Sequence, residues 1–169
     1  MMYKKFSPTL NTTILGIDPG TMRIGYGVIS KKGSHLTALD YGVIEPRAGN
    51  GRFKELAQKL DKLIKKYKPE VAAVEKIFFS KNKKTAIAVA EARGVILFIL
   101  EQHGVKTLEF SPNEIKAAIT GSGASDKKTV SQFTAFALGL KKISGYDDAS
   151  DALAVAVRAA FERSLPAGK

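Results

Sequence analysis

The chain has 169 residues, of which 44% are hydrophobic and 25% charged, a composition typical of one soluble globular domain. It contains no cysteine, which excludes disulfides, thiolate catalysis and cysteine-ligated zinc. The net charge of +11 favours a polyanionic partner such as nucleic acid. No stretch approaches the ~18 apolar residues of a membrane span, and the first residues lack the apolar core of a secretory signal. We therefore expect a cytoplasmic protein with no membrane partner.

The domain organisation predicted from the sequence is simple. Residues 1–11 form a basic N-terminal extension, residues 12–165 a single domain, and residues 166–169 a C-terminal tail. The extension is either a tail that adds nonspecific affinity for nucleic acid or the product of an early start site. No internal repeat or linker divides the chain.

Two apolar runs of the sequence each end in an acidic residue, and they predict the two central strands of the fold. The first runs from Thr13 to Asp18 and breaks at Pro19-Gly20; the second runs from Val71 to Val74 and ends in Glu75. Such runs are typical of strands buried on both faces. If the strands are parallel neighbours, ~4.8 Å apart, their carboxyl ends meet at the edge where open α/β sheets bind ligands. We expect the two carboxylates to face each other across this edge, with a metal ion between them.

Between these runs the pattern predicts a meander and a helix. A second strand covers Ile24 to Ser30, Lys31 to Gly33 form a turn, and a third strand covers His35 to Ile44, with Leu39, Tyr41 and Val43 on one face. Apolar residues then recur at helical spacing from Phe53 to Tyr67, opposite a row of lysines.

After Glu75 the sequence alternates between helices and one more strand. A long helix opens at the lysine cluster 81–84 and ends near Gln102; residues 94–100 are apolar nearly all round, so we expect the sheet on one side and a second subunit on the other. A strand follows from Val105 to Phe110, then a helix capped by Ser111 with Pro112 in its first turn. Two further helices are predicted at 126–138 and from Tyr146 to Arg163. The fold class is therefore α/β, with a five-stranded mixed sheet flanked by helices and with strands one, four and five parallel.

Two more acids open the last predicted helix. Asp148 and Asp151 stand at i and i+3, so they share a face. Taken alone they fit helix capping. If that helix packs across the carboxyl edge of strands one and four, however, Asp18, Glu75, Asp148 and Asp151 converge, and four carboxylates at one point need divalent cations. All-oxygen ligation suits Mg²⁺ or Mn²⁺, and two ions about 4 Å apart can cleave a phosphodiester bond. Asp147 is the alternative to Asp148, which we prefer for its spacing to Asp151.

The same motifs resemble one family. Ile17-Asp18-Pro19-Gly20 with Gly25-Tyr26-Gly27, then Val74-Glu75 with Ile77-Phe78, residues 90–95, and residues 148–153 are similar in order and interval to the RuvC-type Holliday-junction resolvases. The resemblance covers residues 14–163. It implies a ribonuclease-H-like fold, a homodimer, a branch-migration motor complex as partner, and Mg²⁺-dependent paired nicking of four-way (Holliday) DNA junctions in recombination and repair. It also assigns metal-binding, catalytic roles to Asp18, Glu75, Asp148 and Asp151.

The resemblance further suggests DNA contacts. Phe78 matches the family's aromatic that stacks on junction bases, with Phe79 as the alternative. Lys116 and Lys127 match lysines near the scissile phosphate, with Lys128 as the alternative to Lys127. A further three lysines at a predicted helix N-terminus form either a phosphate cradle or a solvated face: Lys81, Lys83 and Lys84.

Two rival functions remain open at this point. A module that binds branched DNA without cutting it would share the basic charge, although it would have no need of four carboxylates. An actin-like ATPase fragment would share the loop Gly16 to Thr21, but such ATPases need two domains, and this chain has room for one.

Overall fold

The computed structural model describes residues 11–77, 83–162 and 165, with the side chains of Lys83 and Lys84 excluded. A single five-stranded sheet in the order β3-β2-β1-β4-β5 forms its centre. β1 and β2 are antiparallel, as are β2 and β3, whereas β4 is parallel to both β1 and β5. The strands are β1 (Asn11–Asp18), β2 (Ile24–Lys32), β3 (His35–Ile44), β4 (Val71–Glu75) and β5 (Lys106–Phe110).

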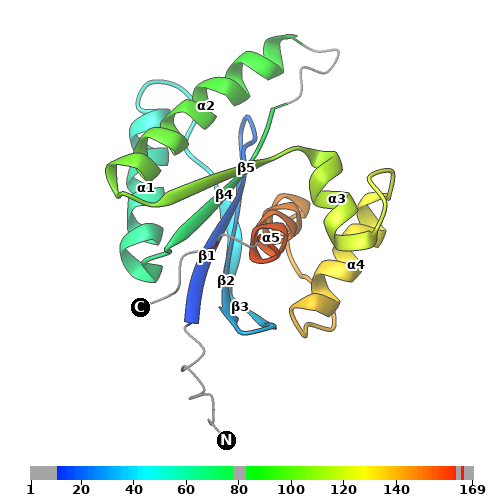
Figure 1. Ribbon diagram of the computed structural model, residues 1–169. Helices are drawn as coiled ribbons and strands as arrows, with labels where there is room; N and C mark the ends of the chain where they lie inside the picture. The colour runs from blue at the N-terminus through cyan, green and yellow to red at the C-terminus, as the bar shows by residue number, and fades with distance from the viewer. Residues whose placement is uncertain (1–10, 78–82, 163–164, 166–169) are drawn as a thin grey trace, which may run out of the picture.

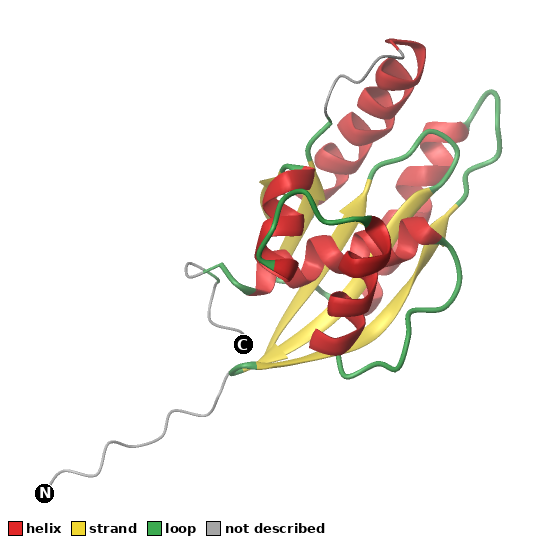
Figure 2. Ribbon diagram, turned by 90° about the vertical axis from the view of Figure 1, so that its right-hand side faces the viewer, coloured by secondary structure: helices red, strands yellow, loops and turns green. Residues whose placement is uncertain are grey.

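Helices cover both faces of the sheet, as Figures 1 and 2 show. α1 and α2 pack on one face, and α3, α4 and α5 lie on the other. The helices are α1 (Arg52–Tyr67), α2 (Lys83–Gln102), α3 (Pro112–Thr120), α4 (Lys127–Ala137) and α5 (Asp147–Ala160). The predicted five-stranded mixed sheet, with β1, β4 and β5 parallel, is confirmed.

The two acid-ended strands are buried as predicted. Ile14, Leu15 and Ile17 of β1 are at most 1% exposed, and residues 71–74 of β4 are fully buried. Ile17 is paired with Val74, one residue before each strand reaches its acid. The side chains of each strand alternate between two apolar clusters, one under α1 and α2 and the other under α3, α4 and α5, so a strand in the middle of this sheet has no polar face.

Three glycines allow α5 to lie unusually close to the sheet. A Cβ atom built on Gly16 or Gly25 would collide with the backbone oxygen of Ala152 or Asp148, and one on Gly27 would come within 2.9 Å of the Cα of Leu153. The glycines in β1 and β2 therefore set the height of α5 above the strands. This brings the first turns of α5 down to the carboxyl edge of β1.

Several predicted boundaries were wrong by a few residues. β1 includes Asn11 and Thr12, which precede the predicted strand start at Thr13. Lys31 and Lys32 belong to β2, where they pair with Leu36 and His35, and the turn comes after them. β5 begins at Lys106 rather than Val105, and α5 ends at Ala160 rather than Arg163, a residue that lies outside the described ranges.

The predicted apolar face of β3 was also wrong in part. The register with β2 shifts between Val28 and Ile29, which pair with Asp40 and Ala38. Leu39 is the extra residue of this β-bulge and is 48% exposed. A bulge breaks the two-residue alternation, so Leu39 does not share a buried face with Tyr41, which packs into the core.

Side-chain caps begin both α3 and α4, and the Ser111 cap of α3 was predicted from the sequence. Ser111 caps α3 in a reciprocal capping box with Glu114, and Asp126 accepts a hydrogen bond from the backbone N–H of Thr129 at the start of α4. These caps fix where each helix begins.

Candidate active site

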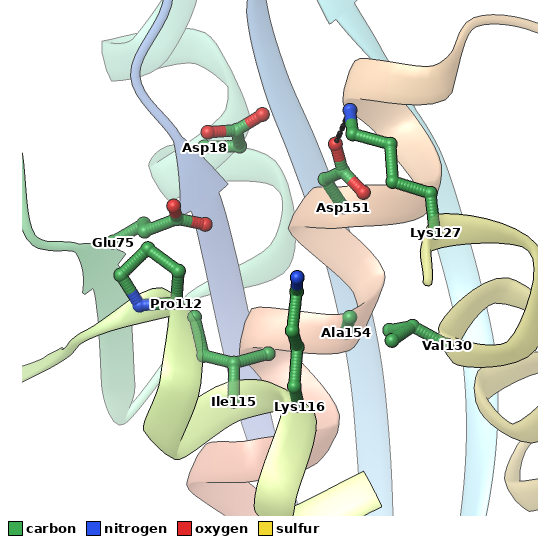
Figure 3. Close-up of a pocket in the computed structure, with 9 residues that line it drawn as sticks. All are labelled: Asp18, Glu75, Pro112, Ile115, Lys116, Lys127, Val130, Asp151 and Ala154. Atoms are coloured by element: carbon green, nitrogen blue, oxygen red, sulfur yellow. Dashed lines mark hydrogen bonds and ion pairs between the residues drawn. The ribbon is translucent and has the colours of Figure 1, made fainter. Parts of the chain in front are cut away.

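A cavity of about 310 Å³ opens at the carboxyl edge of β1 and β4, between the sheet and the helices α3, α4 and α5. Figure 3 shows Asp18 and Glu75 on one wall, Asp151 on the opposite wall, and Lys116 extending between them. Three of the four predicted carboxylates therefore meet here, although they come from positions more than 50 residues apart in the chain. The lining comprises Asp18, Glu75, Pro112, Ile115, Lys116, Lys127, Val130, Asp151 and Ala154.

Asp18 and Glu75 are half-buried carboxylates without a direct partner. Neither accepts a hydrogen bond or forms an ion pair within the described part of the chain. Burial, followed by the negative charges of Glu75, Asp151 and Asp148, raises the pKa of Asp18 to about 8. Burial and the charge of Asp151 raise the pKa of Glu75 to about 7, against the lowering effect of Lys127 and Lys116. These two acids are held where ionisation is unfavourable unless a cation joins them.

Asp151 has a cation of its own. Its Oδ2 accepts a hydrogen bond of 2.9 Å from Nζ of Lys127, the dashed line in Figure 3. That hydrogen bond raises the pKa of Lys127. Lys127 also lowers the pKa of Asp18 and Glu75, so its charge acts on all three carboxylates of the cavity.

Asp148 lies beside the cavity instead of lining it. Its Oδ2 is 3.7 Å from Nε of Arg23, whose guanidinium also stacks 4.6 Å from the centre of the Tyr146 ring. Asp148 is still close enough to Asp18 to raise the pKa of that residue. Within the described ranges, no three acidic or histidine side chains are spaced to hold a metal ion as they stand. The four-carboxylate metal site therefore stays a prediction.

The residues predicted to contact DNA lie in different places, and their contact with DNA stays a prediction. Lys116 and Lys127 line the cavity, whereas Lys128 faces a neighbouring hollow with Gln132 and Asp147. Of the two alternatives, Lys127 is thus the one beside the carboxylates. Four residues of this prediction lie outside the described structure, two with their side chains only: Phe78, Lys81, Lys83 and Lys84, along with the alternative Phe79.

Sequence reasoning missed Arg23 and the apolar floor of the cavity. Arg23 is the last residue before β2, in the loop that follows Asp18-Pro19-Gly20. A cation in that short loop was a usable signal, because the loop joins two strands at the edge where the acids were expected. Ile115, Val130 and Ala154 gave no such signal, since apolar helix residues usually pack in the core.

Comparison with known proteins decides the family. The model of the crossover junction endodeoxyribonuclease RuvC family matches residues 14–159. The chain is 41% identical over 155 residues to the RuvC of Brevibacillus brevis, an alignment that covers 90% of this chain and 93% of that protein. The chain belongs to the RuvC family.

Solved RuvC structures agree with this assignment. The Thermus thermophilus RuvC, alone and in complex with a Holliday junction substrate, superposes with TM-scores of 0.81 and 0.83 at 29% identity. Each comparison covers 89% of this chain and 93–94% of that one. The predicted family, the ribonuclease-H-like fold and the function of a Holliday-junction-resolving endonuclease are confirmed.

Proposed function

We propose that this RuvC-family chain cuts four-way DNA junctions with divalent metal ions held by Asp18, Glu75, Asp148 and Asp151. The observation that carries this proposal is the state of Asp18 and Glu75, which lie side by side at the edge of the sheet, have raised pKa values and have no hydrogen-bond or ion-pair partner among the described residues. A divalent cation would allow both to ionise at neutral pH.

The donor set fits Mg²⁺, with Mn²⁺ as a substitute. Every candidate ligand is a carboxylate oxygen, the donor that these hard cations prefer, and the chain has no cysteine. Two such ions would supply an activated water and stabilise the leaving oxygen of a phosphodiester. Asp148 would join the set by exchanging its contact with Arg23 for a metal ion.

The lysines of the cavity complement these acids. Lys127 orients Asp151 through its hydrogen bond of 2.9 Å, and Lys116 projects into the cavity from α3. A phosphate held beside the carboxylates would lie within reach of both cations. These two residues would therefore neutralise the phosphate that is cut, while the net charge of +11 holds the remaining DNA backbone.

The substrate and partners follow from the family. The Thermus thermophilus relative was solved with a Holliday junction, and we propose the same substrate here. We further propose a homodimer through α2, where Ile87 and Phe98 are 62% and 58% exposed on a helix whose other side packs on the sheet. A branch-migration motor complex is the partner that family membership implies. The described residues contain no helix long and apolar enough to cross a membrane, and a cytoplasmic site fits this proposal.

One experiment tests the activity directly. The chain is incubated with a labelled four-way junction and with linear duplex of the same sequence, each in Mg²⁺ and in EDTA. We expect paired nicks in the junction in Mg²⁺ alone. Tight junction binding without cutting in Mg²⁺ or Mn²⁺ would instead favour the non-cleaving module, and cutting in EDTA would overturn the metal site.

The dimer has a separate test. Light scattering should give twice the chain mass of 18.2 kDa, and Phe98→Asp should reduce it to that of one chain. Phe136→Asp is the matched control, since Phe136 is 84% exposed on α4 and away from α2. A monomeric parent chain would contradict the proposed dimer without affecting the nuclease site.

A further inference from the structure

A second charged hollow lies at the same edge of the sheet as the carboxylates. β3 runs parallel to β1, because each is antiparallel to β2. Asp18 pairs with Gly25, and Gly25 pairs with Val43, so β3 ends level with the end of β1. The chain then turns through residues 45–51 into α1, on the face opposite α5.

The hollow, which we call the α1 groove, lies between this turn and the outer side of α1. Its cations are Arg47, Lys54, Lys59 and Lys62, and its single acid is Glu55. Asn50 and Gln58 add side-chain amides, and Gly51 completes the lining. The groove therefore carries an excess of three positive charges together with neutral hydrogen-bonding groups.

The wall of the α1 groove is fixed by its own contacts. Glu55 accepts a hydrogen bond of 3.0 Å from the backbone N–H of Arg47 and one of 3.3 Å from its Nε, and it pairs with Lys59 at 2.9 Å. Lys59 also donates a hydrogen bond of 2.7 Å to the backbone oxygen of Glu45. These donors hold the pKa of Glu55 down to about 2, so it stays charged and keeps the turn against α1.

The two remaining lysines of the groove, Lys54 and Lys62, are available to bind a ligand. Within the described part of the chain, neither Lys54 nor Lys62 has a hydrogen-bond or ion-pair partner. They stand at i and i+8 with Gln58 midway, so they lie on one side of α1, about 12 Å apart along its axis. An elongated row of cations and amides fits a chain of phosphates better than a single small anion.

One arginine bridges the space between the α1 groove and the carboxylate cavity. Arg23 lies between them, with its Nε 3.7 Å from Asp148 and 3.8 Å from Glu45, the first residue of the turn. A phosphate backbone that crosses the carboxylates can therefore continue past Arg23 to Lys54 along the same sheet edge.

We propose that the α1 groove binds the phosphate backbone of a duplex arm of the junction, away from the point of cutting. This inference rests on the proposed substrate, and it adds a surface on the opposite side of the cavity from Lys127. Its contribution is to affinity and arm placement, since no group in it reaches the carboxylates.

The test compares two double variants of equal charge in EDTA, where no cutting occurs. Lys54→Gln/Lys62→Gln alters the groove. Lys32→Gln/Lys65→Gln is the control, because Lys32 lies at the far end of β2 and Lys65 in the last turn of α1, both away from the active edge. Binding is measured over a range of salt with a long-armed junction and with one whose arms end just beyond the branch point.

For the groove variant we expect about 3- to 30-fold weaker binding to the long-armed junction and a salt slope lower by about 2. Its affinity for the short-armed junction should equal that of the parent chain. Equal losses in both double variants, or a loss that does not depend on arm length, would overturn the proposal. Junction cutting by the parent chain tests the nuclease separately, so the groove can fail while the nuclease assignment stands.

Discussion

Two carboxylates at one edge of the sheet are treated in opposite ways. Asp18 at the end of β1 has a pKa raised to about 8, chiefly by burial and by neighbouring acids. Glu55 in the first turn of α1 has a pKa lowered to about 2, chiefly by the backbone N–H of Arg47 and the ammonium of Lys59. The pKa values of these two carboxylic acids thus lie on opposite sides of the usual values of 3.8 for aspartate and 4.5 for glutamate.

This difference in pKa distinguishes a carboxylate with a structural role from the carboxylates of the candidate active site. Glu55 already has hydrogen-bond and ion-pair partners in Arg47 and Lys59, so its charge is neutralised within the protein and holds the turn against α1. Asp18 and Glu75 are placed together by two buried, hydrogen-bonded strands, and no cation among the described residues pairs with either acid directly, so we expect a cation from solution to neutralise them. An acid that has no direct partner among the described residues is therefore the better indicator of the active site.

Removing the charge of Asp18 should have the largest effect. Asp18→Asn should slow junction cutting by about a thousandfold or more, because an amide cannot replace a carboxylate between divalent ions. Junction binding in EDTA should stay equal or become tighter, since a negative charge next to phosphate is lost. The control is Asp61→Asn, which removes an acid paired with Lys65 and His103 at the other end of α1. Normal cutting by the Asp18 variant would mean that the site has been misassigned.

A change in the height of α5 should come next. Gly25→Ala places a methyl group against the backbone oxygen of Asp148, so the first turn of α5 must shift. We expect a loss of about 1–3 kcal/mol in the free energy of unfolding from overpacking, together with a fall in cutting at temperatures where the variant is folded. Thermal unfolding and a cutting assay measure the two effects.

Gly94→Ala is the matched control for this change. Nothing in the described part of the single chain lies within 4 Å of a Cβ atom on Gly94, which is inside α2. Because Gly94 lies on the exposed face of α2 that carries Phe98, the stability of both glycine variants is compared in the Phe98→Asp background, where Gly94→Ala should be neutral or should stabilise the chain by up to about 1 kcal/mol. A Gly25 variant as stable and active as the Gly94 variant would show that α5 can move away from the sheet without cost, which would contradict the role given to Gly25.

The two neighbouring lysines of α4 should differ in effect. Lys127→Ala removes the hydrogen bond to Asp151 and a charge that favours ionised Asp18 and Glu75. Cutting should fall by about 10- to 100-fold, and the acid limb of its pH profile should move to higher pH. Lys128→Ala, which changes a side chain facing the neighbouring hollow, should shift neither the rate at saturating enzyme nor that limb. Identical profiles for the two variants would remove Lys127 from the site.

The smallest expected effect is on stability against pH in EDTA. The pKa values of Asp18 and Glu75 are higher in the folded chain than their usual values of 3.8 and 4.5, so between pH 4 and 8 the folded state binds more protons than the unfolded state. The free energy of unfolding should therefore decrease as the pH rises from about 5 to about 8. Asp18→Asn should flatten this slope, and added Mg²⁺ should oppose it.

Glu55 changes the stability with pH in the opposite direction: its stabilisation is present above its usual pKa of 4.5 and is lost as the pH falls towards 2. A stability curve that rises between pH 5 and 8 would contradict the raised pKa values.

The sequence predicted those features that local patterns determine. The buried runs that end in Asp18 and Glu75 could be predicted from hydrophobicity and a following break, and the Ser111 cap from its position directly before Pro112. The sequence could not predict the bulge at Leu39, because a bulge depends on the register with a partner strand. Nor could it separate Lys127 from Lys128, which requires the orientation of α4 relative to α5.

The α1 groove illustrates the same limit. Lysines opposite the apolar side of α1 are typical of a solvated helix face, and nothing in their spacing distinguishes Lys54 from Lys65. The groove arises because residues 45–51 return over the first turns of α1, a contact made by Arg47 and Glu45 from outside the helix. Tertiary structure alone turns part of a lysine-rich face into a concave surface.

The central claim is that Asp18 and Glu75 bind divalent cations, and titration calorimetry with Mg²⁺ or Mn²⁺ tests it most directly. At pH 7, in buffers of different ionisation enthalpy, we expect the chain to bind the metal and to release protons, because acids with pKa values of about 8 and 7 must lose them to become ligands. Asp18→Asn/Glu75→Gln should abolish both the binding and the proton release. Metal binding that persists unchanged in this double variant, or an absence of binding by the parent chain with and without junction DNA, would contradict the account.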